Sequence, residues 1–171
     1  MTEHNTHVAP ARQTPEILNL AEARTAVVRG ANIPAESIAA FYDASFNALA
    51  GFLEQRGLTP VGPAFGLYTR MPSDTMDLEV GFAIDHPLSG DHTLDDGTVV
   101  HASVLPGGSA ATVSHLGSYE QLSGAWSGLM DWVRDNGRTP GLPFWEVYVT
   151  EPSPTADPSS MRTDLYLPVD R

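Results

Sequence analysis

The chain has 171 residues, enough for one domain with a substantial core or for two small fused units. Its 21 acidic and 9 basic residues give a net charge of −12 without any cluster of basic residues, so a nucleic-acid partner is not expected. Cysteine is absent, which excludes a disulfide framework and a thiolate metal site.

Residues 1–14 are polar and lack the apolar segment of a signal peptide, so we expect a disordered tail. The most apolar run, 37–53, is interrupted by Asp43, Ser45 and Asn47 and is not expected to span a membrane. These features predict a cytoplasmic protein with one domain at 15–171.

The first half of the domain has the pattern of two strands, a helix and a hairpin. The helix is expected over 34–56, with Gly57 ending it. An acidic loop at 85–97 contains histidines and aspartates without a recognised metal-binding spacing, so no metal is expected. Runs of β-branched and aromatic residues predict strands at 16–20, 25–29, 64–70 and 76–84.

The second half repeats this order. A capping box formed by Ser118 and Gln121 is expected to begin its helix, and Asn136 is expected to end it. His115, just before the helix, is expected to hydrogen-bond the backbone rather than act in catalysis. Strands are predicted at 99–105, 110–115, 144–150 and 161–169.

Three short matches, in the same order in both halves, support a duplication. Residues 20–28 align with 105–113, 63–68 with 143–148, and 77–80 with 164–167. We therefore predict an α+β fold made by tandem duplication of a strand–helix–strand–strand unit, at about 16–84 and 99–169. Its antiparallel sheets are expected to form a groove, with the two helices packed on the other side.

Glu146 lies within an otherwise aromatic and β-branched strand. Alternation places Glu146 on one face with Phe144 and Tyr148, and places Trp145 on the opposite, core-facing side. A carboxylate there is costly unless it is solvated, hydrogen-bonded or paired with a cation. The pattern therefore indicates an aromatic-walled groove with an acid on its floor.

The same alternation predicts one shared surface that faces away from the helices. Gly66 aligns with Glu146, so its missing side chain would leave room for a ligand opposite the acid. Trp126 and Tyr119, on the second helix, are candidates for the end of the pocket, although a core position accounts for them as well. The candidate surface consists of Gly66, Tyr68, Glu79, Phe144, Glu146, Tyr148 and Tyr166.

An ordinary solvated sheet face is the alternative interpretation of this surface. Several aromatic rings on a bare sheet face would form an exposed apolar patch, and such patches usually bind something. An acid within an aromatic wall suits a lipophilic cation, through charge pairing and cation–π attraction.

Three stretches together resemble the GyrI-like small-molecule-binding family: L-P-G-G-S-A-A-T-V-S-H-L-G-S-Y-E-Q-L at 105–122, W-x-x-L-x-x-W at 126–132 and P-F-W-E-V-Y-V-T-E-P at 143–152. The resemblance covers roughly residues 15–170. It implies the fold of the effector-binding domains of bacterial drug-sensing regulators of the AraC and MerR types. It also implies that Glu146 is the strand glutamate that binds cationic, lipophilic drugs in that family. No helix-turn-helix segment is present, so we expect a stand-alone binder or enzyme.

Three functions stay open at this point. The first is capture of an aromatic or cationic small molecule by a monomer or dimer, without a cofactor. The second, which the resemblance implies for some members, is hydrolysis of cyclopropane-bearing or similar electrophilic genotoxins, with Glu146 as general base and Glu79 as supporting acid. The third is a protein-binding inhibitor of DNA gyrase, which the acidic charge permits.

Overall fold

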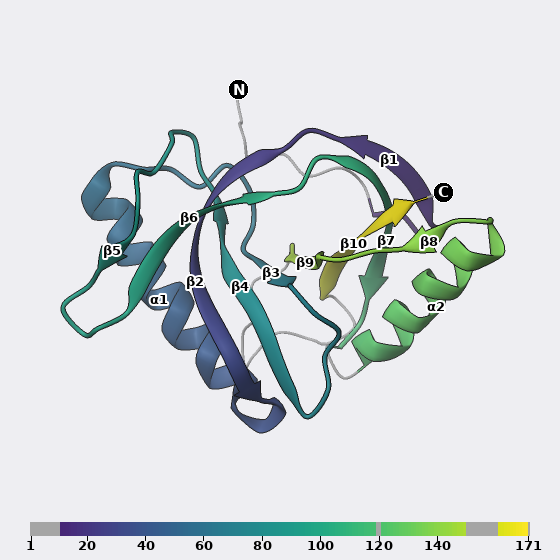
Figure 1. Cartoon of the computed structure of the whole chain (residues 1–171), viewed down its shortest axis with the longest axis horizontal. Coiled ribbons are helices and arrows are strands. Elements are labelled where there is room, and N and C mark those ends of the chain that lie inside the picture. Colours follow the sequence, from purple (N-terminus) through teal and green to yellow (C-terminus); the bar gives the residue numbers. More distant parts are fainter. Residues whose placement is uncertain (1–10, 119–120, 150–160, 171) are drawn as a thin grey trace.

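The computed structural model describes residues 11–118, 121–149 and 161–170 (Figure 1). Two helices pack on a sheet of ten strands, which confirms the predicted α+β class. The elements in chain order are β1 (Glu16–Leu20), β2 (Ala23–Pro34), the 3-10 turn η1 (Ala35–Ser37), α1 (Ile38–Arg56), β3 (Phe65–Tyr68), β4 (Thr75–Ala83), β5 (His92–Thr93), β6 (Val99–Leu105), β7 (Gly108–Leu116), α2 (Leu122–Asp135), β8 (Thr139–Pro140), β9 (Phe144–Tyr148) and β10 (Arg162–Asp170).

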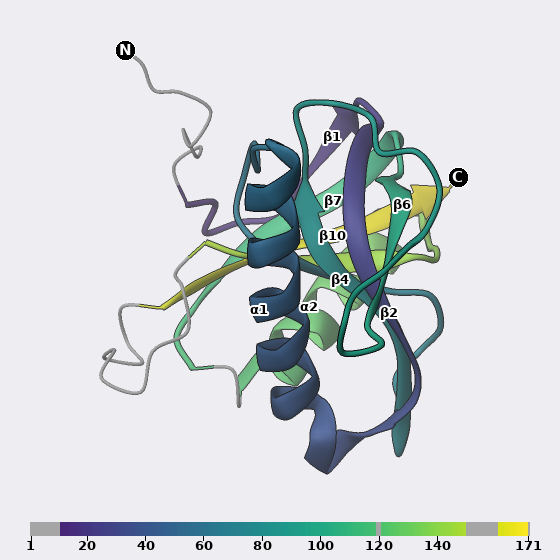
Figure 2. The same ribbon diagram turned by 90° about the vertical axis from the view of Figure 1, so that its left-hand side faces the viewer.

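The order of the strands in the sheet confirms the predicted duplication. The order is β1-β7-β10-β9-β3-β4-β2-β6-β5, with β8 paired to β10. Counted outwards from the centre, the first unit gives β3-β4-β2 and the second gives β9-β10-β7, so the two units have the same internal order. Each helix packs on its own unit, α1 on β2 and β4 and α2 on β7 and β10. Figure 2 shows α2 behind α1 on the same side of the molecule.

Each unit contributes one strand that pairs with the outermost strand of the other unit. β1 precedes β2 in the chain but pairs with β7, and β6 precedes β7 but pairs with β2. Figure 1 shows both connections as long arches across the top of the view. Each unit therefore supplies a strand to the other, which joins the two halves into one sheet.

The first helix and the strand before it follow from local sequence. β2 continues to Pro34, beyond the predicted 25–29, through an irregularity between Gly30 and Ile33. Asn32 has a φ of 54° there, a conformation that asparagine tolerates better than most residues, and its N–H donates to Asp77 Oδ1 at 2.8 Å. Gly57, with a φ of 68°, ends α1 as predicted.

The start of α2 differs from the prediction. The helix begins at Leu122, and Gln121 occupies the cap position without a side-chain hydrogen bond, so the predicted capping box is wrong. The side chain of Gln121 lies against Gly117 instead. His115 places a ring nitrogen 2.8 Å from the carbonyl oxygen of Ser118, which confirms its predicted bond to the backbone. The two-residue strands β5 and β8 were missed because they are too short to show a period.

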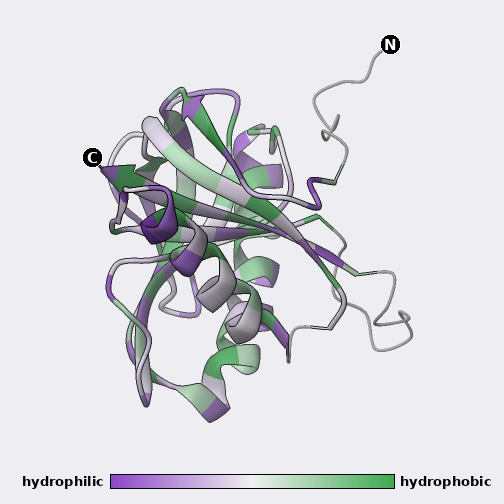
Figure 3. Ribbon diagram, turned by 90° about the vertical axis from the view of Figure 1, so that its right-hand side faces the viewer, coloured by the Kyte–Doolittle hydropathy of each residue, from purple (hydrophilic) through white to green (hydrophobic). Residues whose placement is uncertain are grey.

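Both faces of the central strands are buried. The helix side carries the larger core, which includes Leu49, Leu129 and Leu165. The opposite side carries a second cluster of Val27, Phe65, Leu67 and Trp145, against which Leu20 and Leu105 pack from the ends of β1 and β6. Figure 3 shows hydrophobic and hydrophilic residues along the strands.

Neither α-helix in the described part of the chain has both the length and the apolar character that crossing a membrane requires.

Candidate functional site

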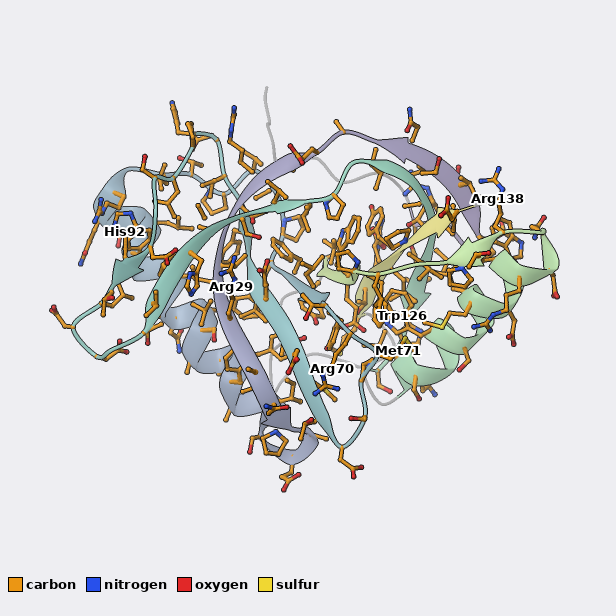
Figure 4. The ribbon with its side chains drawn as sticks, in the orientation of Figure 1. Arg29, Arg70, Met71, His92, Trp126 and Arg138 are labelled. Carbon is orange, nitrogen blue, oxygen red and sulfur yellow. The ribbon has the colours of Figure 1, made fainter. Side chains whose placement is uncertain are left out.

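A cavity of about 590 Å³ lies between α1 and α2, over the helix side of β3 and β9. This volume is within the range of small-molecule sites. Met71, from the β3–β4 hairpin, and Trp126, from α2, are labelled in Figure 4, and both line the cavity. The lining residues are Ile38, Ala39, Tyr42, Asp43, Phe46, Tyr68, Met71, Pro72, Met76, Leu122, Ser123, Trp126, Ser127, Met130, Phe144, Glu146 and Tyr148.

Glu146 is the buried acid of the cavity, with only 6% of its surface exposed. Trp126 Nε1 donates to its Oε2 at 2.7 Å, and the Tyr148 hydroxyl lies 2.8 Å from its Oε1. An ionised carboxylate offers about four acceptor positions. These two contacts therefore leave acceptor positions for a ligand.

Three tyrosine hydroxyls continue from Glu146 into the first unit. Tyr148 Oη lies 2.8 Å from Tyr42 Oη, which lies 2.8 Å from Tyr68 Oη. Each hydroxyl has one proton and an ionised carboxylate only accepts. When Glu146 is ionised, the donation within this chain therefore runs from Tyr68 to Tyr42, from Tyr42 to Tyr148 and from Tyr148 to Glu146.

Burial dominates the pKa values in this network. It raises the pKa of Glu146 above the ordinary 4.5, although the hydrogen bonds from Trp126 and Tyr148 act in the opposite direction. Burial also raises the pKa values of Tyr42, Tyr68 and Tyr148. The three phenols therefore stay protonated and act as hydrogen-bond donors.

The space over Gly66 is filled by this network. A Cβ atom at Gly66 would lie 2.6 Å from Tyr42 Oη and 2.9 Å from Tyr148 Oη. The expectation that Gly66 leaves open room for a ligand is therefore wrong. The glycine instead allows the tyrosine hydroxyls to approach the strand, directly across from Glu146 in the β3–β9 pairing.

We expect Gly66→Ala to lower the free energy of unfolding by about 1–3 kcal/mol, because the methyl group overpacks the tyrosine hydroxyls. Urea denaturation measures this effect. Gly62→Ala is the matched control, since a Cβ there would contact nothing within 4 Å. Equal stability of the two variants would show that the hydroxyls move aside without cost.

The predicted common surface is wrong for two of its members. Glu79 pairs with Leu67 across β3 and β4, and Tyr166 pairs with Trp145 across β9 and β10. Directly paired residues share a face, so both lie on the side opposite to Glu146. Glu79 accepts there from Arg29 Nε at 2.8 Å and Ser103 Oγ at 2.7 Å. Tyr166 stacks on Trp145 with ring centroids 5.5 Å apart.

The other members stay together but face the helices. Tyr68, Phe144, Glu146 and Tyr148 line the cavity, and Gly66 lies beneath them on the same face. The prediction that this surface faces away from the helices is therefore wrong. Trp126 does lie at the cavity, whereas Tyr119 lies outside the described residues.

Several cavity residues were missed from the sequence. Tyr42 was not distinguished from the core of α1, and Phe46 and the methionines at the cavity were not considered. One signal could have found Tyr42, because it precedes Trp126 by 84 residues, close to the offsets between the repeated strands. The methionines Met71, Met76 and Met130 carry no comparable signal.

The family comparison covers nearly all of the described chain. The model of the GyrI-like small molecule binding domain matches residues 13–170. Comparison with curated protein sequences gives no significant match.

Solved structures share this fold. The C-terminal domain of EcmrR superposes with a TM-score of 0.76 at 22% identity, over 92% of this chain and 98% of that domain. The EcmrR chain in the EcmrR–DNA complex gives a TM-score of 0.75 at 23% identity. The match covers 92% of this chain but only 57% of the EcmrR chain.

Two further structures have the same fold at lower identity. SAV2435 bound to tetraphenylphosphonium has a TM-score of 0.63 at 12% identity, over 92% of this chain and 94% of that one. A hydrolase from Listeria innocua has a TM-score of 0.64 at 17% identity, over 95% of this chain and 94% of the hydrolase chain. With the family match across 13–170, these results establish that the chain belongs to the GyrI-like small molecule binding domain family.

Proposed function

We propose that this chain binds lipophilic cations with aromatic substituents in the cavity between α1 and α2, where Glu146 pairs with the positive charge. The observation that carries the proposal is a buried carboxylate inside an apolar, aromatic cavity. No basic residue is found among the described residues that line this cavity, so a cationic ligand would bring a counter-charge that the lining does not supply.

The charge of Glu146 is only partly compensated within the protein. Burial raises the pKa of Glu146 even though Trp126 and Tyr148 donate to it as neutral groups and the charge of His115 also acts to lower it. A cation placed beside the ionised carboxylate would offset the cost of desolvation. The net charge of −12 adds a long-range attraction for cations.

Aromatic rings line the cavity that contains the acid. Phe144 lies 4.5 Å from Trp126 and 5.5 Å from Tyr68, centroid to centroid, and Tyr42 stacks on Phe46 at 5.7 Å. Ring faces attract cations, and ring surfaces pack on aromatic ligand groups. A positive charge inside an aromatic ligand therefore satisfies both parts of the cavity.

Methionines complete the apolar lining. Met71 and Met76 flank the β3–β4 turn, and Met130 comes from α2. Unbranched thioether side chains adapt to ligands of different outline. This lining supports recognition of a class of lipophilic cations rather than one compound.

Calorimetric titration with two matched compounds tests the proposal. Tetraphenylphosphonium supplies a permanent charge and phenyl rings, and it is the compound bound by SAV2435, which shares the fold. Triphenylphosphine oxide keeps three phenyl rings without net charge. We expect clearly tighter binding of the cation at low salt. Equal affinity, or no binding of the cation, would contradict the proposal.

Cation binding should depend on pH through Glu146. Its raised pKa means that the free protein takes up a proton at a pH above 4.5 as the pH falls, and a protonated carboxyl cannot pair with a charge. We expect the affinity for tetraphenylphosphonium to fall by up to about tenfold per pH unit below the raised pKa. Titrations between neutral pH and the lowest pH at which the protein stays folded measure this. An equally steep dependence in Glu146→Gln would assign it to another group.

Hydrolysis of an electrophilic ligand is the second candidate, supported by the contact between Glu146 and the phenol chain. A carboxylate with a raised pKa can act as general base on water, and a protonated phenol can donate to a leaving group. Glu79 cannot assist, because it lies across the sheet. Mass spectrometry of a cyclopropane-bearing genotoxin incubated with the protein tests this candidate. Addition of one water to the compound would support hydrolysis. Recovery of the unchanged compound after binding would exclude it.

A further inference from the structure

The two helices line the cavity with equivalent positions. Five residues of α1 and five of α2 take part, and every pair is separated by 84 residues. The strands follow the same relation at an offset of 80, which matches Tyr68 with Tyr148 and Gly66 with Glu146. The pairs from the helices are Ile38 and Leu122, Ala39 and Ser123, Tyr42 and Trp126, Asp43 and Ser127, and Phe46 and Met130.

This internal symmetry has an axis at the centre of the sheet. Gly66 pairs directly with Glu146 across β3 and β9, and the two residues are also each other's equivalents in the duplication. The two-fold axis passes between two residues that the duplication exchanges. Glu146 therefore lies at the centre of the cavity floor, and equivalent residues of α1 and α2 form its opposite walls.

Charge breaks the symmetry at two positions. The second unit supplies Glu146 on the floor, where the first unit has Gly66. The first unit supplies Asp43 on the wall, where the second unit has Ser127. The cavity thus has two acids of different character, one buried beside the axis and one exposed on the α1 wall.

Among the described residues, Asp43 makes no contact that would give it a role in stabilising the fold. Within 11–118, 121–149 and 161–170 it makes no hydrogen bond or ion pair, whereas Glu79 and Asp164 are each bound by an arginine and a serine. An unpaired carboxylate on the wall of an otherwise aromatic cavity is available to a second positive group of a ligand.

Tyr42 relates the two acids in space. It precedes Asp43 in the chain, and its hydroxyl reaches Tyr148 Oη, which contacts Glu146. Its ring therefore extends from the wall that carries Asp43 towards the floor that carries Glu146. A rigid aromatic spacer of comparable length, packed along this ring, would carry one positive group to each acid.

We propose that the cavity selects elongated aromatic dications, with one positive group at Glu146 and the second at Asp43. The inference rests on the proposed function, because it assumes that the first positive group binds at Glu146. Amidines are suitable probes, since they form paired hydrogen bonds with carboxylates and stay charged near neutral pH.

The experiment compares mono- and diamidines on benzene, biphenyl and terphenyl spacers, all para-linked, by calorimetric titration at low salt. At the spacer that fits, the diamidine should bind about fivefold more tightly than its monoamidine, the upper end for an exposed ion pair. Asp43→Asn and Asp43→Ser, the latter copying Ser127, should remove this advantage, so that the diamidine and the monoamidine bind each variant with affinities within about twofold of one another. The advantage should also shrink as salt is added.

Asp135→Asn is the matched control, because Asp135 is exposed on α2, does not line the cavity and carries the same charge. It should keep the diamidine advantage. The inference is overturned if the diamidine shows no advantage at any of the three spacers, or if its advantage survives both Asp43 variants. In either case the proposed function still stands, provided that Glu146→Gln weakens binding of the monoamidines. If no amidine binds, or if Glu146→Gln weakens none, both proposals fail.

Discussion

Glu146→Gln is expected to weaken tetraphenylphosphonium binding by about 1.5–3 kcal/mol, or roughly 10- to 150-fold, the Coulomb energy of two unit charges about 6–10 Å apart at an effective dielectric constant of about 20. Glutamine has the shape of glutamate, and its amide oxygen can still accept from Trp126 Nε1, which now donates at 2.7 Å. The loss therefore reports the charge and not the packing. Titration of both proteins with the cation and with triphenylphosphine oxide measures it, and the neutral compound should bind both proteins equally.

Glu79→Gln provides the control for this experiment. Glu79 is also a buried strand glutamate, 8% exposed, and its replacement changes the net charge by the same amount. It lies on the other side of the sheet, bound to Arg29 and Ser103. It should leave the affinity for the cation unchanged wherever the protein is folded. Equal losses in the two variants would mean that overall charge, and not the cavity acid, attracts the cation.

Trp145→Ala is expected to lower the free energy of unfolding by about 3–5 kcal/mol. Trp145 neighbours Glu146 but faces the opposite cluster, where it is 3% exposed and stacks on Tyr166. Its removal leaves a large cavity between the sheet and the residues at the ends of β1 and β6. Urea denaturation measures the loss, and Trp145→Phe, which keeps most of the ring contacts, should lose much less.

Leu142→Ala is a suitable comparison for Trp145→Ala, because Leu142 is 48% exposed and its truncation should change stability by less than about 0.5 kcal/mol. If the Trp145→Ala protein were as stable as the Leu142→Ala protein, the claim that Trp145 stabilises the fold through the second cluster would be contradicted. Where Trp145→Phe is folded, it should bind tetraphenylphosphonium with unchanged affinity, since Trp145 does not line the ligand cavity.

The helices and the duplication could be predicted because both depend on patterns that extend over many residues. The end of α1 was predicted from Gly57, which adopts the left-handed conformation there. The repeated order of elements predicted two equivalent units. The exchange of β1 and β6 between the units could not be predicted, because a strand pattern does not show which neighbour will pair with it.

There is a physical reason why the sequence could not show which face of the central strands packs against the helices. Alternation shows which residues share a face, but it identifies the core side only when the other side is polar. In β9 both Trp145 and Phe144 are buried, so each face resembles a core face. Glu146 was accordingly grouped correctly with Phe144 and Tyr148 but assigned to the wrong side of the sheet. Because of this error, Glu79 and Tyr166 were wrongly included in the candidate site.

The contacts that define the cavity depend on tertiary structure. Trp126 could be placed on a helix stripe, but its bond to Glu146 requires α2 to cross β9 at one position. Tyr42 likewise contacts Tyr148 across a separation of 106 residues. Only the equal offset between the two helices, read together with the alignment of Gly66 and Glu146, would have indicated that these side chains meet over the same strand pair.

A crystal structure of the protein with tetraphenylphosphonium tests the central claim most directly. The cation should lie between α1 and α2, with its phenyl rings against Tyr42, Trp126 and Phe144 and its charged centre beside the Glu146 carboxylate. The same crystals grown from Glu146→Gln at equal ligand concentration should show the cavity with lower occupancy. A cation bound on the Glu79 side of the sheet, or bound at the surface while the cavity holds only water, would contradict the claim.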